Sequence, residues 1–142
     1  GNMTITATKD GKEVTIGNNA FEVTADDVKT DSKWVFDLKF EGSTWLDAAD
    51  KAATWTVVEK VNADSNGKLA DIPTKDCPAG VTFDAATRTL TISDAEKITK
   101  DATVILRAVR TGEKISESEQ ETDNVKFVTV TLKAPAKDES GG

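Results

Sequence analysis

The stretch KWVFDLKF, residues 33–40, decides the fold class because its large apolar side chains alternate with polar ones. On an extended chain, one face of this stretch would carry Trp34, Phe36, Leu38 and Phe40. The opposite face would carry Asp37 and Lys39. A period of two along the chain marks a β-strand with one buried face.

Similar short runs lie on both sides of this stretch. Before it they cover residues 3–8, 13–16 and 20–24, and after it residues 54–61, 81–83, 88–92, 102–110 and 124–134. Asp10 and Gly11 supply hairpin-turn chemistry between the first two runs. Ser43 can cap a short helix over residues 43–53, and Ser93 with Glu96 forms a capping box for one helical turn. We therefore expect an all-β Greek-key antiparallel β-sandwich of about seven to nine strands, with one or two short helical turns.

Composition limits the partners. The chain of 142 residues has 25 acidic and 18 basic side chains, which gives a net charge of −7. An acidic surface repels a phosphate backbone, so we expect no nucleic acid partner. No apolar run approaches the ~20 residues that a membrane helix needs, so we expect no membrane insertion. Gly1 and Asn2 are expected to be cloning remnants, residues 3–134 one domain, and residues 135–142 a linker or disordered tail.

The residue types present exclude many enzyme chemistries. The chain has no histidine and only one cysteine, Cys77. This removes Ser-His-Asp and Cys-His nucleophile activation and the common zinc sites. We expect Cys77 to be a half-buried side chain without a reactive role. A hydrolase with two paired carboxylates is the enzyme alternative, but the sequence favours a protein that is not an enzyme.

Calcium is considered at two places, and no cofactor is expected. Asn62, Asp64 and Asn66 place oxygen ligands at alternate positions before Gly67, as in a calcium-binding loop. The twelfth position of that loop is Pro73, where a bidentate Glu belongs, so a simple turn is expected. Asp26 and Asp27 could chelate calcium together with the acidic residues Glu117, Glu119, Glu121 and Asp123, although solvated charge is the preferred interpretation.

Residues 78–92, PAGVTFDAATRTLTI, resemble a signature of the Ig-like and cadherin-like modules of bacterial surface proteins. In that family a Pro-x-Gly turn, here Pro78 to Gly80, precedes a short strand. An Asp-x-x-Thr turn, here Asp84 to Thr87, then leads to a second strand. The resemblance implies an Ig-like sandwich and an extracellular or cell-surface location. The interdomain calcium motifs of cadherins are not found.

The resulting functional hypothesis is a non-catalytic Ig-like module of a bacterial cell-surface or secreted multidomain protein. It would act as a monomeric spacer, adhesion or interaction domain that contacts neighbouring domains of the parent chain, or a protein or glycan ligand. The candidate contact residues are Trp45 and the acidic loop with Glu117, Glu119, Glu121 and Asp123. The alternative is a carbohydrate-binding module attached to an extracellular enzyme, which requires an exposed Trp45. A Lys–Asn isopeptide crosslink at Asn124 is a further possibility.

Overall fold

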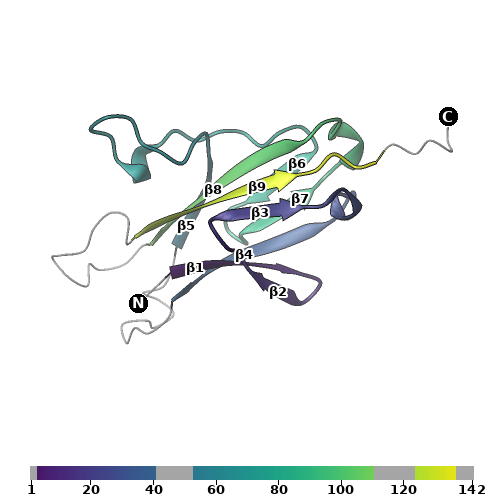
Figure 1. Cartoon of the computed structure of the whole chain (residues 1–142), viewed down its shortest axis with the longest axis horizontal. Helices are drawn as coiled ribbons and strands as arrows, with labels where there is room; N and C mark the ends of the chain where they lie inside the picture. The colour runs from purple at the N-terminus through teal and green to yellow at the C-terminus, as the bar shows by residue number, and fades with distance from the viewer. Residues whose placement is uncertain (1–2, 41–52, 111–123, 137–142) are drawn as a thin grey trace.

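Strand β4 (Lys33–Phe40) lies in the middle of the first of two sheets (Figure 1). The computed structural model describes residues 3–40, 53–110 and 124–136, and these ranges contain nine strands. The first sheet has the order β2 (Lys12–Thr15), β1 (Met3–Lys9), β4, β7 (Thr89–Ile92) and β6 (Val81–Asp84). All its neighbouring strands are antiparallel.

The second sheet has the order β3 (Ala20–Val23), β9 (Val125–Leu132), β8 (Ala102–Arg110) and β5 (Ala53–Val58). Two of its three pairs are antiparallel, but β3 runs parallel to β9. The parallel pair differs from the antiparallel expectation. It arises because the chain changes sheets between β2 and β3, so that β3 reaches the edge of the second sheet without a hairpin partner. The predicted β-sandwich is confirmed.

The core lies between the two sheets and is filled by the alternating side chains that the sequence predicted. Trp34, Phe36 and Leu38 are all buried. Phe36 is fully enclosed, and its ring centroid lies 6.3 Å from that of Trp55, on β5 of the opposite sheet. The predicted core positions of Trp34 and Trp55 are therefore confirmed.

The predicted turns are largely confirmed. Asp10 and Gly11 both have positive φ, which is the backbone of a type I′ hairpin turn between β1 and β2. Asp84 Oδ1 accepts a hydrogen bond from the Ala86 N–H at 2.9 Å and closes the β6–β7 turn. Three short 3-10 turns are described: η1 (Ala25–Asp27), η2 (Leu69–Asp71) and η3 (Ala95–Lys97).

One predicted cap is wrong by one residue. The cap of η3 is Asp94 rather than Ser93, because the Asp94 side chain accepts the hydrogen bond from the Glu96 N–H at 3.1 Å. The Ser93 N–H instead donates to the Gly80 carbonyl. The helix predicted over residues 43–53 lies outside the described residues, except for Ala53, which begins β5.

The long connection between β5 and β6 packs on the outer surface of the second sheet. Thr74 forms a bridge with Val58, at the free edge of β5. The buried Arg107 side chain of β8 donates from Nη1 to the carbonyls of Leu69 and Ile72, at 3.1 and 2.9 Å. Within the described ranges, no helix is long and apolar enough to cross a membrane.

Candidate functional site

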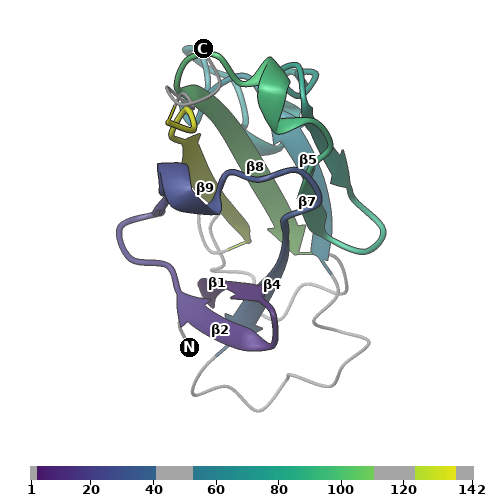
Figure 2. The ribbon, with the colours of Figure 1, turned by 90° about the vertical axis from the view of Figure 1, so that its right-hand side faces the viewer.

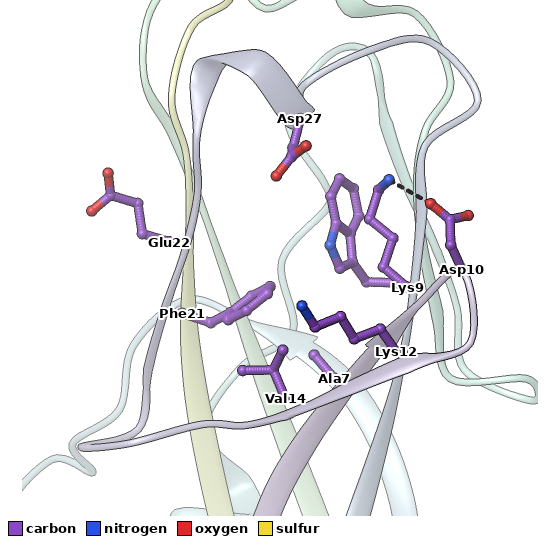
Figure 3. Close-up of a pocket in the computed structure, with 9 residues that line it drawn as sticks. Ala7, Lys9, Asp10, Lys12, Val14, Phe21, Glu22 and Asp27 are labelled. Atoms are coloured by element: carbon purple, nitrogen blue, oxygen red, sulfur yellow. Dashed lines mark hydrogen bonds and ion pairs between the residues drawn. The ribbon is translucent and has the colours of Figure 1, made fainter.

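A groove of about 440 Å³ opens at one margin of the sandwich, between the β1–β2 hairpin and the β3–η1 segment (Figure 3). We call it the hairpin groove. Its apolar floor is formed by Ala7, Val14, Phe21 and Trp34. Its rim is charged and consists of Lys9, Asp10, Lys12, Glu22 and Asp27. An apolar hollow with a few polar groups around it is the usual form of a ligand site.

The groove exists because β2 extends the first sheet beyond the reach of the second. The register sets Val14 opposite Ala7 and Lys12 opposite Lys9, so both β2 residues share the face that the buried Ala7 turns toward the core. Yet all four residues of β2 are exposed, and Val14 retains 45% of its accessible surface. An apolar side chain on the inner face of a sheet is normally covered. Here it lines an open groove.

Phe21 forms the wall of the groove that belongs to the second sheet. Its ring meets the ring of Phe36 edge to face, with centroids 6.1 Å apart and an interplanar angle of 88°. Because Phe36 is fully buried, this contact joins the groove directly to the core. This wall of the groove is therefore packed against the core.

The charges around the groove are not all paired. Lys9 Nζ lies 3.0 Å from Asp10 Oδ2 and 5.8 Å from the centre of the Trp34 ring, so it is held by an ion pair and a cation–π contact. Lys12 forms no ion pair in the part of the chain that the structure describes. In Figure 3, Lys12 and Asp27 point into the groove, whereas Glu22 points away from it. The groove thus offers a cation, Lys12, without an ion-pair partner among the described residues and, toward η1, the carboxylate of Asp27.

Most of the contact residues predicted from the sequence are not placed. Trp45, Glu117, Glu119, Glu121 and Asp123 lie outside the described residues. Of the predicted pair Asp26 and Asp27, Asp27 lines the hairpin groove. The other two tryptophans, Trp34 and Trp55, are each only 3% exposed, so neither offers a ring face on which a sugar could stack.

The calcium candidates occupy an exposed turn. The Gly67 N–H donates to the Asp64 carbonyl at 2.8 Å, and Asn66 has a φ of 65°. The Asp64 carboxylate is paired with Lys60, with Nζ and Oδ1 2.7 Å apart, and this hydrogen bond raises the pKa of Lys60. Within residues 3–40, 53–110 and 124–136, no three Cys, Asp or Glu side chains gather as metal ligands would.

Cys77 is half-buried and packs against the core. Burial raises the pKa of its thiol, and the neighbouring Asp76 carboxylate raises it further. A thiol with a raised pKa carries little thiolate at neutral pH and is a poor nucleophile. The structure therefore gives Cys77 a packing role.

The hairpin groove is not apparent from the sequence. Its lining comes from five separate segments, β1, β2, β3, η1 and β4. The available signal was the alternation in KEVT, residues 12–15, which puts Lys12 and Val14 on one face of a strand at the start of the chain. Nothing in that pattern shows that the opposite sheet ends before it covers them.

Comparisons with protein-family models, with curated proteins and with solved structures found no match to this chain.

Proposed function

We propose that this chain is a non-catalytic, Ig-like binding module of a bacterial cell-surface or secreted multidomain protein, and that it recognises its partner through the hairpin groove. The observation that supports the proposal is the groove itself, where the exposed Val14 and the half-buried Phe21 face one another beneath Lys12, which forms no ion pair with any described residue. Protein interfaces usually have apolar surface at the centre and polar or charged groups at the rim.

The surroundings of the groove also support binding rather than chemistry. A nucleophile needs a neighbouring base, or a lowered pKa, to react at neutral pH. The titratable side chains of the groove are lysines and carboxylates, with no serine or cysteine in its lining. Lysines and carboxylates around an apolar floor orient a ligand and hold it.

The setting on a bacterial surface rests on the resemblance of residues 78–92 to the surface-module signature. In that stretch Gly80 has a φ of 83°, and Asp84 holds the following turn. These features account for why the signature has Gly and Asp at those positions. Gly80 and Asp84 therefore specify the fold and not the ligand. We assign ligand binding to the hairpin groove.

The test is a binding screen on three proteins, using a phage-displayed random peptide library and a glycan array. The proteins are the unaltered chain, Val14→Arg, which fills and charges the groove, and the matched control Val61→Arg. Val61 has a similar exposure, 37% against 45%, but lies in the turn after β5. We expect ligands that bind the unaltered chain and Val61→Arg and that lose binding to Val14→Arg. If the ligands bind all three proteins equally, or if no ligand is found, the proposal that the hairpin groove binds a partner is wrong.

A further inference from the structure

The two sheets of the sandwich are unequal, and the difference lies at the hairpin groove. The first sheet has five strands and the second has four within the described residues. Figure 1 shows β3 at the edge of its sheet and the β1–β2 hairpin extending beyond that edge, and Figure 2 shows β2 at the margin of the molecule from a second direction. In the arrangement of a sandwich, the place opposite β2 is that of a fifth strand of the second sheet.

The backbone of β3 can accept such a strand. The carbonyls of Asn19 and Val23 accept hydrogen bonds from the Thr129 and Lys133 N–H groups, at 2.8 and 3.0 Å. Backbone groups of successive strand residues point to opposite sides, so the N–H and C=O of Glu22 point away from β9. No described strand pairs with β3 on that side. An open strand edge is a template for pairing with another chain.

The side chains along this edge specify what an added strand would carry. Its inward side chains would lie over the groove, where Phe21 and Val14 provide an apolar surface. Asp27 lies beyond the C-terminal end of β3 and points into the groove, as Lys12 does from the hairpin (Figure 3). In Figure 3 Lys12 lies between Asp27 and Val14, so a complementary strand has a basic residue toward Asp27, then an acidic residue toward Lys12 and then an apolar residue, at alternate positions.

We propose that the hairpin groove receives an extended segment of a partner protein, which pairs antiparallel with the free edge of β3 and completes the second sheet. The segment has the pattern base–x–acid–x–apolar, and its apolar side chain enters between Phe21 and Val14. This inference rests on the proposed function and goes further, because it assigns the ligand to polypeptide and the mode of binding to strand addition.

The probe is the blocked peptide Thr-Lys-Thr-Glu-Thr-Val-Thr, titrated into the isotope-labelled chain and followed by amide NMR shifts. We expect shifts confined to β2, β3 and η1, and slower hydrogen exchange of the Glu22 amide. Exchanging the Lys and Glu of the peptide should weaken binding by roughly three- to ten-fold, because two surface charge pairs then become repulsive. Lys12→Gln should remove part of this preference, whereas Lys33→Gln should leave it unchanged. Lys33 is exposed on β4, next to β7, and does not line the groove.

Backbone methylation separates strand addition from simple side-chain insertion. In one peptide the amides of residues 2, 4 and 6 are N-methylated, and in another those of residues 3 and 5. Strand pairing uses the amides of alternate residues only, so one modified peptide should bind and the other should lose binding by roughly ten-fold or more. If both bind like the unmodified peptide, strand addition is wrong while the groove remains a binding site. If no peptide shifts the β3 amides, the assignment to polypeptide is wrong, and the glycan arm of the screen decides the proposed function separately.

Discussion

Gly80 and Gly11 have nearly the same left-handed backbone, with φ of 83° and 79°, but very different surroundings. A Cβ on Gly80 would lie 2.3 Å from the Asp94 carbonyl oxygen and 3.1 Å from Lys97 Cβ. A Cβ on Gly11 would meet nothing within 4 Å. The contact at Gly80 is with backbone, which cannot move aside as a flexible side chain can. Gly80 therefore sets how closely the turn before β6 approaches η3.

These two glycines give a matched pair of substitutions. Gly11→Ala should lower the free energy of unfolding by about 1–2 kcal/mol, which is the cost of a left-handed backbone for a residue with a Cβ. Gly80→Ala should cost about 1–3 kcal/mol more, because the clash adds to the same backbone cost. Urea denaturation of the three proteins measures both values. If both variants lose the same free energy of unfolding, the close contact of the Gly80 turn with the Asp94 carbonyl does not constrain residue 80.

The reactivity of Cys77 tests its position in the same way. Because burial raises the pKa of the thiol above its ordinary value of 9.0, little thiolate is present near neutral pH. We expect a disulfide reagent at about pH 8 to modify the folded chain roughly ten-fold or more slowly than the urea-unfolded chain. Asp76→Asn should speed the folded-state reaction, since it removes a neighbouring negative charge. Equal rates in the folded and unfolded chains would place the thiol in solvent.

At the scale of elements, one buried side chain ties the segment between β5 and β6 to β8. Arg107 is 7% exposed, its Nη1 binds the Leu69 and Ile72 carbonyls, and its Nε has no hydrogen-bond partner among the described residues. The guanidinium thus ties η2 to β8 through neutral acceptors. Removing it would take the Arg107 donor from the Ile72 carbonyl and leave the Leu69 carbonyl with the Ile72 N–H, at 3.4 Å.

Arg107→Ala should therefore destabilise the chain by about 2 kcal/mol, mainly by opening this segment. Trypsin can report the opening, because Lys60, Lys68 and Lys75 all lie between β5 and β6. We expect cleavage at these lysines to become faster than global unfolding allows. Arg107→Lys should give a smaller change, since one ammonium can still reach a carbonyl. Unchanged cleavage in Arg107→Ala would mean that the loop is held by its other contacts.

The elements also differ in how far the sequence could predict them. Strand β4 and the β6–β7 hairpin were predictable because their information is local, in the alternation of KWVFDLKF and in the Asp84 turn. The parallel pairing of β3 with β9 was not predictable, since it joins residues more than a hundred positions apart, Ala20 with Thr129. The same reason hid the hairpin groove: Lys12 and Asp27 are ordinary surface residues until the fold brings them to one opening.

At the scale of the whole molecule, Asp101 contributes to the way the stability of the folded chain changes at acid pH. Asp101 precedes β8, and its carboxylate accepts hydrogen bonds from the Ala134 N–H and from Lys133 Nζ, each at 2.9 Å. The first of these is the main reason that the pKa of Asp101 lies below its ordinary value of 3.8. The second hydrogen bond, from Lys133 Nζ to Asp101, raises the pKa of Lys133. The pair closes the end of the β8–β9 ladder just before the described chain ends.

The sign of the pH dependence follows from these shifts. A carboxyl with a lowered pKa in the folded state adds stability above its unfolded pKa of 3.8, and this stability is lost as the pH falls through the lower folded value. Lys133 behaves in the opposite sense: its contribution to stability is present below pH 10.5 and is lost as the pH rises through its raised folded pKa.

Asp101→Asn should therefore be less stable than the unaltered chain at neutral pH, and the difference in stability should shrink in acid below pH 3.8. Urea denaturation midpoints of the two proteins across this range measure the difference, with Asp10→Asn as the control, because Asp10 is an exposed aspartate paired with Lys9 on the hairpin. A difference between Asp101→Asn and the unaltered chain that stays constant into acid would show that Asp101 contributes through its shape and hydrogen-bonding capacity rather than through its charge.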